Sequence, residues 1–156
     1  MSMATSNATH VIANEKQVVT FCLDEQEYAL DVANVVEVVR MVAITKSSQA
    51  AGAFVGMINL RGLVIPVLNL RQCLGLPDKA ISLDDQLLIV QVGERNAALI
   101  VDSVEEALII PADRLASPQH IAAELAQDLD AVAKLGDRLL LIIDPLALLP
   151  EDAVRA

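Results

Sequence analysis

Two aspartates follow aliphatic runs of the chain, at positions where paired carboxylates could do acid–base chemistry. Asp102 ends the run LIVD and Asp144 ends the run LIID. Two carboxylates held side by side can share a proton, as they do in aspartic proteases. Such sites need a small residue and then glycine after the acid, but Ser-Val and Pro-Leu follow here. An aspartate that leaves a strand commonly accepts hydrogen bonds from backbone N–H groups, so turn and cap roles are favoured over catalysis.

The other residues that could do chemistry stand alone. His10 and His120 lie in a polar terminal stretch and at the start of an expected helix, and a lone exposed histidine is more often solvated than catalytic. Cys22 and Cys73 form no CxxC pair, which argues against zinc and thioredoxin-type redox chemistry. Walker, dinucleotide-binding, zinc-protease and serine-hydrolase motifs are absent from the sequence. The sequence therefore predicts a protein that is not an enzyme and has no cofactor or metal.

Composition and charge argue against two classes of partner. The 156-residue chain carries a formal net charge of −10 and contains only one Tyr and two Phe. Phosphate backbones and anionic lipids attract basic surfaces, and unpaired bases stack on exposed aromatics, so the chain suits none of them. Its longest apolar run, around Leu139 to Ile143, is far too short to cross a bilayer, and its polar N-terminus does not resemble a signal peptide. We therefore expect a cytoplasmic protein that binds no nucleic acid and does not insert directly into a membrane.

One arginine interrupts the most apolar stretch of the chain, GMINLRGLVIPVLNLR, which runs from Gly56 to Arg71. The residues on both sides are rich in branched side chains, and Arg61-Gly62 is a two-residue break between them, which predicts a β-hairpin. A type I′ turn prefers Asn, Asp or Gly at its first central position, so Arg61 fits this turn only moderately well. Because an arginine at a hairpin tip faces water or a partner, Arg61 is a candidate contact residue.

The elements that position these residues are expected to be mainly strands. Eight or nine short apolar segments are separated by turn signals. The clearest segments are QVVTFCL (17–23), YALDV (28–32), the two arms of the hairpin (57–60 and 63–68), QLLIVQV (86–92), AALIVDSV (97–104) with EEALII after it, and RLLLIID (138–144). The composition of residues 46–54 predicts a loop. Strands at such short spacing, joined by recurrent hairpin turns, favour small β-barrels over parallel βαβ units.

Helical signals are short. They predict one turn from about Val32, capped by Asp31 and passing into extended chain by about Glu37, one or two turns after Asn69, a helix that starts at Ser117 and continues through 121, 125 and 129, and a last turn over 145–149. These helices interrupt the barrels but do not form a layer of their own.

The stretch from Gly56 to Arg71 closely resembles the signature of CheW-like domains, roughly G-V-I-N-L-R-G-x-V-I-P-V-x-D-L-R. Three further blocks are similar to the family's in the same order: VVTFCLDEQEYALDVANVVEVV, AALIVDSVEEAL and LGDRLLLIIDPLALL. The resemblance implies a mainly β fold of two packed, small, five-stranded SH3-like β-barrels with a few short helices. It implies a single domain over residues 16–150, with a flexible tail over 1–15 and another over 151–156. It also implies a strand from about Leu129, where the residues alone suggest a helix.

The resemblance implies a function as well. Members of the family are non-catalytic adaptors that couple the cytoplasmic tips of methyl-accepting chemoreceptors to the regulatory domain of a CheA-type histidine kinase. Such an adaptor is cytoplasmic and is recruited to receptor arrays at the inner face of the membrane. Similar adaptors serve receptor–kinase pathways for surface motility, biofilm formation or development, and the sequence leaves these open beside flagellar chemotaxis.

Family members bind the receptor tip in a groove between the barrels. The matching positions here are Val35, Glu37, Val38, Gly56, Asn59 and Arg61. By this resemblance Arg61 offers a fork of donors to oxygens of the receptor tip, while the two valines take its apolar face. Gly56 is expected to allow a turn that a side chain would forbid. A structural role for Arg61 is the alternative, with its guanidinium packed inside the protein and tied to a carboxylate such as that of Glu37.

Overall fold

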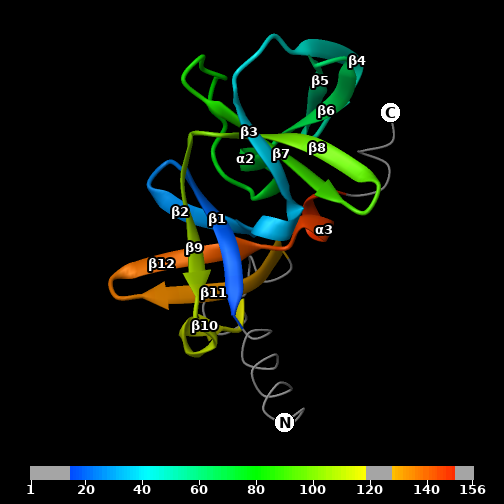
Figure 1. Ribbon diagram of the computed structural model, residues 1–156. Coiled ribbons are helices and arrows are strands. Elements are labelled where there is room, and N and C mark those ends of the chain that lie inside the picture. The colour runs from blue at the N-terminus through cyan, green and yellow to red at the C-terminus, as the bar shows by residue number, and fades with distance from the viewer. Residues whose placement is uncertain (1–14, 119–127, 150–156) are drawn as a thin grey trace, which may run out of the picture.

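Strands with alternating buried and exposed side chains build most of the fold. The computed structural model describes residues 15–118 and 128–149, and in these ranges the chain forms two six-stranded sheets, one in the lower and one in the upper half of Figure 1. In β3, for example, every second side chain is exposed and the ones between are partly buried, the pattern of a strand with one side to solvent. The expected mainly β fold is confirmed.

The first sheet uses strands from near both ends of the described chain and is called the terminal barrel here. Its strand order is β10-β11-β12-β2-β1-β9. The strands are β1 (Lys16–Leu23), β2 (Gln26–Asp31), β9 (Ser103–Ile110), β10 (Leu115–Ala116), β11 (Leu129–Leu135) and β12 (Arg138–Ile143). Neighbours are antiparallel except β12 and β2, which are parallel.

The second sheet is formed by the middle of the chain and is called the central barrel. Its strand order is β3-β7-β8-β6-β5-β4. The strands are β3 (Val35–Arg40), β4 (Thr45–Ala51), β5 (Phe54–Leu60), β6 (Leu63–Asn69), β7 (Gln86–Val92) and β8 (Arg95–Val101). Here β6 and β8 form the parallel pair.

Six strands in each sheet are compatible with the expected five-stranded barrels. The two edge strands of the terminal barrel, β9 and β10, are consecutive in the chain and separated only by Pro111 and the 3-10 turn η2 (Ala112–Arg114). The edge strands of the central barrel, β3 and β4, are likewise consecutive, with residues 41–44 between them. Each pair is one bent segment that passes from one edge of its sheet to the other, so each sheet curls into a barrel of five chain segments.

Aliphatic side chains form three clusters: one inside each barrel and one between the barrels. The shared cluster joins Phe21 and Leu30 of the terminal barrel to Leu68, Leu88 and Leu99 of the central barrel. In β6, Ile65 and Val67 face the inside of the central barrel while Leu68 faces the shared cluster. Both faces of β6 are therefore buried along its second half, which explains why alternation is weak in the sequence.

Short helical turns lie at the expected places. They are η1 (Val32–Asn34), capped by Asp31, α2 (Leu70–Cys73), capped by Asn69, and α3 (Pro145–Leu148), capped by Asp144. Each cap accepts a hydrogen bond from a backbone N–H in the first turn, as its residue type predicts. No helix in the described residues is long and apolar enough to cross a membrane.

Two expectations about local structure were wrong. Residues 46–54, expected as a loop from their small and polar side chains, contain most of β4 and the start of β5. Leu129 begins strand β11, so the helical spacing through this residue does not describe the structure and the strand implied by the family resemblance does. The rest of the helix expected from Ser117, with His120, falls mainly in 119–127, outside the described residues, as do the expected tails over most of 1–15 and all of 151–156.

Candidate functional site

The candidate site is built around the tight turn between β5 and β6. In this hairpin Leu60 pairs with Leu63, which leaves Arg61 and Gly62 as the two turn residues. Their φ angles are 52° and 84°, so both lie in the left-handed region that a type I′ turn requires. The Gly62 N–H donates a hydrogen bond of 2.9 Å to Asn59 Oδ1. Asn59 is exposed, and its side chain stabilises the turn through this hydrogen bond.

The Arg61 side chain turns back toward strand β3 and forms an ion pair with Glu37. The guanidinium donates to Glu37 Oε2, and the two side chains are 67% and 32% exposed. The structural alternative for Arg61 named Glu37 correctly as its partner. It also expected the guanidinium to be packed inside the protein, whereas the Arg61 side chain is exposed. Exposed ion pairs add only about 0.2–1 kcal/mol to stability, so this pair is readily exchanged for another.

An apolar hollow of about 240 Å³ opens beside this ion pair. Its walls come from β3, the β5–β6 hairpin, β7 and β8, with Val36, Leu60, Leu63, Ile65 and Ile89 among the apolar residues and Glu37, Arg61, Gln91 and Asn96 among the polar ones. Val36 and Leu63 are more than half exposed, so both are accessible to a partner at the rim of the hollow. Sequence reasoning missed both residues, although the apolar strand start after Gly62 was a usable signal for Leu63.

The structure places the six candidate residues in different surroundings. Glu37 and Arg61 are in direct contact, and Asn59 lies under the same turn. Val38 is 38% exposed, on the solvent side of β3. The other two face inward: Val35 packs against the cluster between the barrels, and Gly56 is buried.

Gly56 is needed for a close approach of two strands. A Cβ at this position would lie 2.3 Å from the Thr45 carbonyl oxygen of β4, and such an overlap cannot occur without a backbone shift. Its position within β5 corrects the expectation that Gly56 allows a turn.

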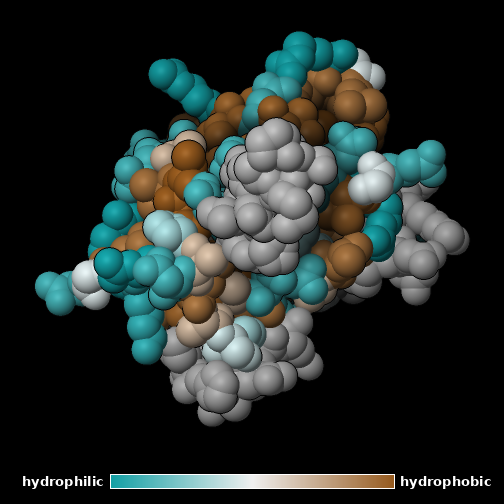
Figure 2. All heavy atoms as spheres, turned by 60° about the horizontal axis from the view of Figure 1, so that its bottom comes forward, coloured by the Kyte–Doolittle hydropathy of each residue, from teal (hydrophilic) through white to brown (hydrophobic). Residues whose placement is uncertain are grey.

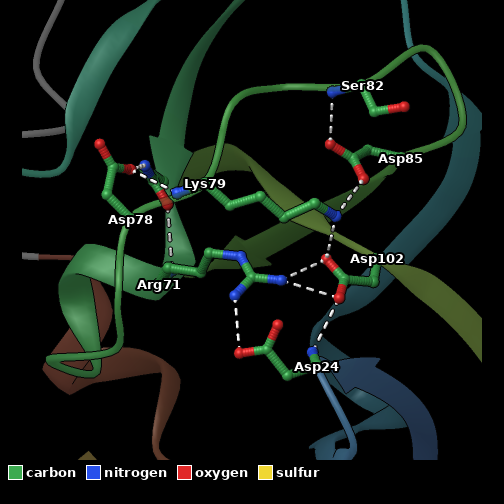
Figure 3. Close-up of polar contacts among 8 residues, drawn as sticks. Asp24, Arg71, Asp78, Lys79, Ser82, Asp85 and Asp102 are labelled. Atoms are coloured by element: carbon green, nitrogen blue, oxygen red, sulfur yellow. Dashed lines mark hydrogen bonds and ion pairs between the residues drawn. The ribbon is translucent and has the colours of Figure 1, made fainter.

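Asp102 and Asp144, the other candidate pair, have separate structural roles. Asp144 Oδ1 accepts a hydrogen bond of 3.0 Å from the Leu146 N–H and caps α3. Both carboxylate oxygens of Asp102 accept hydrogen bonds of 2.8 Å from Arg71 Nη2 (Figure 3). Burial alone would raise the pKa of Asp102, but hydrogen bonds from Arg71 and from a backbone N–H hold it below its usual value. Two carboxylates that share a proton must be hydrogen-bonded to each other. Asp102 is instead bonded to Arg71 and the Asp24 N–H, and Asp144 to the Leu146 N–H, so the cap and turn interpretation is favoured.

The described residues offer little to a metal or a covalent mechanism. Within 15–118 and 128–149, no three His, Cys, Asp or Glu side chains are grouped closely enough to hold a metal ion. Cys22 and Cys73 are free thiols, and burial raises the pKa of Cys73 to about 11. A thiol with such a pKa is protonated at neutral pH and is a poor nucleophile.

Two packed β-barrels with an exposed ion pair at the rim of an apolar hollow are features that suit a protein-binding module. The chain matches the family model of the CheW-like domain over residues 17–153. Among curated relatives, chemotaxis protein CheW of Bacillus subtilis is 27% identical over 146 residues, which cover 93% of this chain and 94% of the relative. Chemotaxis protein CheW of Thermotoga maritima is 30% identical over 134 residues, which cover 83% and 85%.

Known structures agree with the sequence comparison. The crystal structure of the scaffolding protein TtCheW from Thermoanaerobacter tengcongensis aligns with a TM-score of 0.79 at 32% identity, covering 90% of this chain and 97% of that one. The chain belongs to the CheW-like domain family. This confirms the family expected from the hairpin motif, together with its fold and its general role as a chemotaxis coupling adaptor.

Proposed function

We propose that this chain couples methyl-accepting chemoreceptors to a CheA-type histidine kinase, and that the receptor contacts the surface around the Arg61–Glu37 ion pair. The observation that carries this proposal is the exposed ion pair at the rim of an apolar hollow, in a chain of the CheW-like family. Such a surface combines area for apolar burial with a charged group that can change its partner.

A receptor tip is an amphipathic helical hairpin, and the hollow suits one. Val36 and Leu63 are exposed and can be covered by the apolar face of a helix, at about 25 cal/mol for each Å² of apolar surface removed from water. Arg61 can then turn its planar fork of donors from Glu37 to carboxylates or carbonyls of the tip. Because the Arg61–Glu37 pair is exposed and weak, this exchange costs little.

The kinase and the location of the protein complete the proposal. A kinase regulatory domain of the same two-barrel fold is the expected second partner, and receptors would recruit the adaptor to arrays at the cytoplasmic face of the membrane. The net charge of −10 favours approach to a basic partner surface and disfavours nucleic acid and anionic lipid. Catalysis has no part in the proposal, and neither do cofactors.

Affinity purification of the tagged protein from its own cells tests the proposal. Mass spectrometry should recover a CheA-type kinase and a methyl-accepting receptor, and the identity of the receptor would distinguish flagellar chemotaxis from surface motility, biofilm formation or development. Recovery of neither partner, from cells that express both, would refute the proposal.

Two variants test the proposed surface in the same experiment. Arg61→Ala should lose the receptor and keep the kinase. Arg138→Ala is the matched control, because Arg138 is also an exposed, ion-paired arginine near a hairpin turn but lies in the terminal barrel. If Arg61→Ala recovers as much receptor as the parent does while its melting temperature falls, Arg61 has a structural role instead.

A further inference from the structure

A buried arginine lies at the junction of the two barrels. Arg71 is in α2, directly after strand β6, and its side chain is only 7% exposed. Its Nη1 lies 2.9 Å from Asp24 Oδ2, and its Nη2 donates to both oxygens of Asp102 (Figure 3). Lys79 Nζ adds a second cation 3.4 Å from Asp102 Oδ1. We call Arg71, Asp24, Asp102 and Lys79 the Arg71 latch.

The members of the Arg71 latch come from both barrels. Asp24 is in the β1–β2 turn of the terminal barrel, whereas α2 extends from the central barrel. Asp102 is the single residue between β8 and β9, where the chain crosses from one barrel to the other. Among the ion pairs of residues 15–118 and 128–149, only the Arg71–Asp24 pair joins one barrel to the other.

Backbone hydrogen bonds strengthen this connection. The Asp24 N–H donates to Asp102 Oδ2 over 2.7 Å, and the Asp102 N–H donates to the Cys22 carbonyl oxygen over 3.1 Å. Asp24 has a φ of 58°, a left-handed conformation that aspartate adopts more readily than most other L-residues do. The turn of the terminal barrel is therefore held in one conformation by the crossover residue of the chain.

The remaining contacts between the two barrels constrain their relative orientation less. The cluster between the barrels consists mainly of Leu, Val and Ile, with one stacked Phe21–Tyr28 pair that lies within the terminal barrel. Apolar burial is non-directional, so aliphatic surfaces can pack at more than one angle at similar cost. Two side-chain hydrogen bonds also cross the junction, from the Val104 N–H to Gln86 and from Arg95 to the Leu149 carbonyl, but neither is part of an ion pair.

We propose that the Arg71 latch fixes the orientation of the two barrels relative to each other, while the aliphatic cluster supplies most of the energy that holds them together. Arg71 is buried, whereas the Asp24 side chain is 57% exposed. Ion pairs of a buried arginine add little net stability compared with apolar groups of the same volume, but their hydrogen bonds are directional. Arg71 is thus a positioning residue, which matters to any partner that contacts both barrels at once.

The test measures the geometry of the barrels and needs no partner. Spin labels are attached at Arg40→Cys on β3 and Lys134→Cys on β11, both exposed, in a chain carrying Cys22→Ala and Cys73→Ala. Pulsed electron–electron double resonance then gives the distribution of distances between the two labels, one on each barrel. In a neutralised chain with Arg71→Met, Asp24→Asn and Asp102→Asn, we expect this distribution to broaden or its mean to shift, with a melting temperature equal to or above that of the parent.

A matched control neutralises one arginine and two carboxylates that lie within one barrel. Arg138→Met, Glu27→Gln and Glu106→Gln remove one arginine and two carboxylates from the terminal barrel alone, and the distance distribution should stay as in the parent. An unchanged distribution in the neutralised latch, or an equal broadening in the control, overturns the proposal. If the neutralised latch does not fold, Asp24→Asn alone decides: a broader distribution than in the parent supports the proposal, and an identical one overturns it.

Discussion

Arg61 reaches Glu37 from a backbone conformation that arginine seldom adopts, with a φ of 52°. The left-handed region costs an ordinary L-residue about 1–2 kcal/mol, whereas Asn and Gly occupy it readily. The exposed ion pair with Glu37 returns only part of this energy. An arginine that is unfavourable for its own turn agrees with the proposed contact role, because locally unfavourable residues concentrate at functional sites.

Arg61→Asn should separate stability from binding. Asn-Gly is the preferred sequence of a type I′ turn, so the variant should gain about 0.5–1 kcal/mol in free energy of unfolding. It should bind the receptor much more weakly than the parent, since the guanidinium is gone. Urea denaturation and a pull-down of the receptor measure the two effects. A variant that is less stable than the parent would show that the left-handed conformation of Arg61 is not unfavourable in this turn.

Glu37→Gln should leave receptor binding intact or strengthen it. Glu37 holds the Arg61 guanidinium in the free protein, and a carboxylate of the receptor would have to displace it. The neutral amide competes less, and loss of an exposed pair costs at most about 1 kcal/mol of stability. Titration of the receptor against parent and variant checks this. Loss of binding equal to that of Arg61→Ala would mean that Glu37 itself contacts the partner.

Gly56→Ala should destabilise the central barrel by more than about 2 kcal/mol, because the added methyl group meets the Thr45 carbonyl oxygen of the neighbouring strand. Gly52→Ala is the control: its Cβ would meet nothing within 4 Å, and only its φ of 58° is unfavourable, at about 1 kcal/mol. Thermal unfolding of both variants gives the comparison. Equal losses would contradict the prediction, because they would show that the close approach of β4 adds no more than the left-handed backbone of Gly52 does.

The stabilising effect of Asp102 should depend on pH. Its pKa in the folded protein is lowered by Arg71, by the Asp24 N–H and by Lys79, against the opposing effect of burial. The charged form is therefore favoured by folding, and its contribution is complete above the unfolded pKa of about 4 and is lost as the pH falls through the lower folded value. The melting temperature of Asp102→Asn should lie below that of the parent near neutral pH, and the difference should shrink below about pH 4. A difference that does not change with pH would rule out the charge of Asp102 as its cause.

The sequence was most informative where one physical rule acted alone. The hairpin turn at Gly62 and the caps at Asn69 and Asp144 follow from local backbone chemistry, and the structure contains them. Local rules failed where tertiary pairing decides: residues 46–51 are small and polar, yet they form β4 by pairing with β5. For the same reason, the helical spacing near Leu129 does not describe the structure, because Leu129–Leu135 form β11 by pairing with β12.

The candidate site was only partly predictable. Arg61 was identified because a charge in an apolar hairpin is conspicuous, and Glu37 came from the family resemblance. The exposure of Val36 could not be foreseen, since five valines occur in residues 32–39 and alternation alone does not say which side faces solvent. The Arg71 latch was missed because its carboxylates lie 47 and 31 residues from Arg71 in the sequence, counted from Asp24 and Asp102.

Control of the kinase by the receptor is the most direct test of the adaptor function. Autophosphorylation of the recovered CheA-type kinase is measured with its receptor in membranes, without the adaptor, with the parent chain and with Arg61→Asn. We predict that receptor ligands change kinase activity only when the parent chain is present, and that Arg61→Asn, though folded, fails to restore this control. Receptor control of the kinase that is equally strong without the chain would contradict the account.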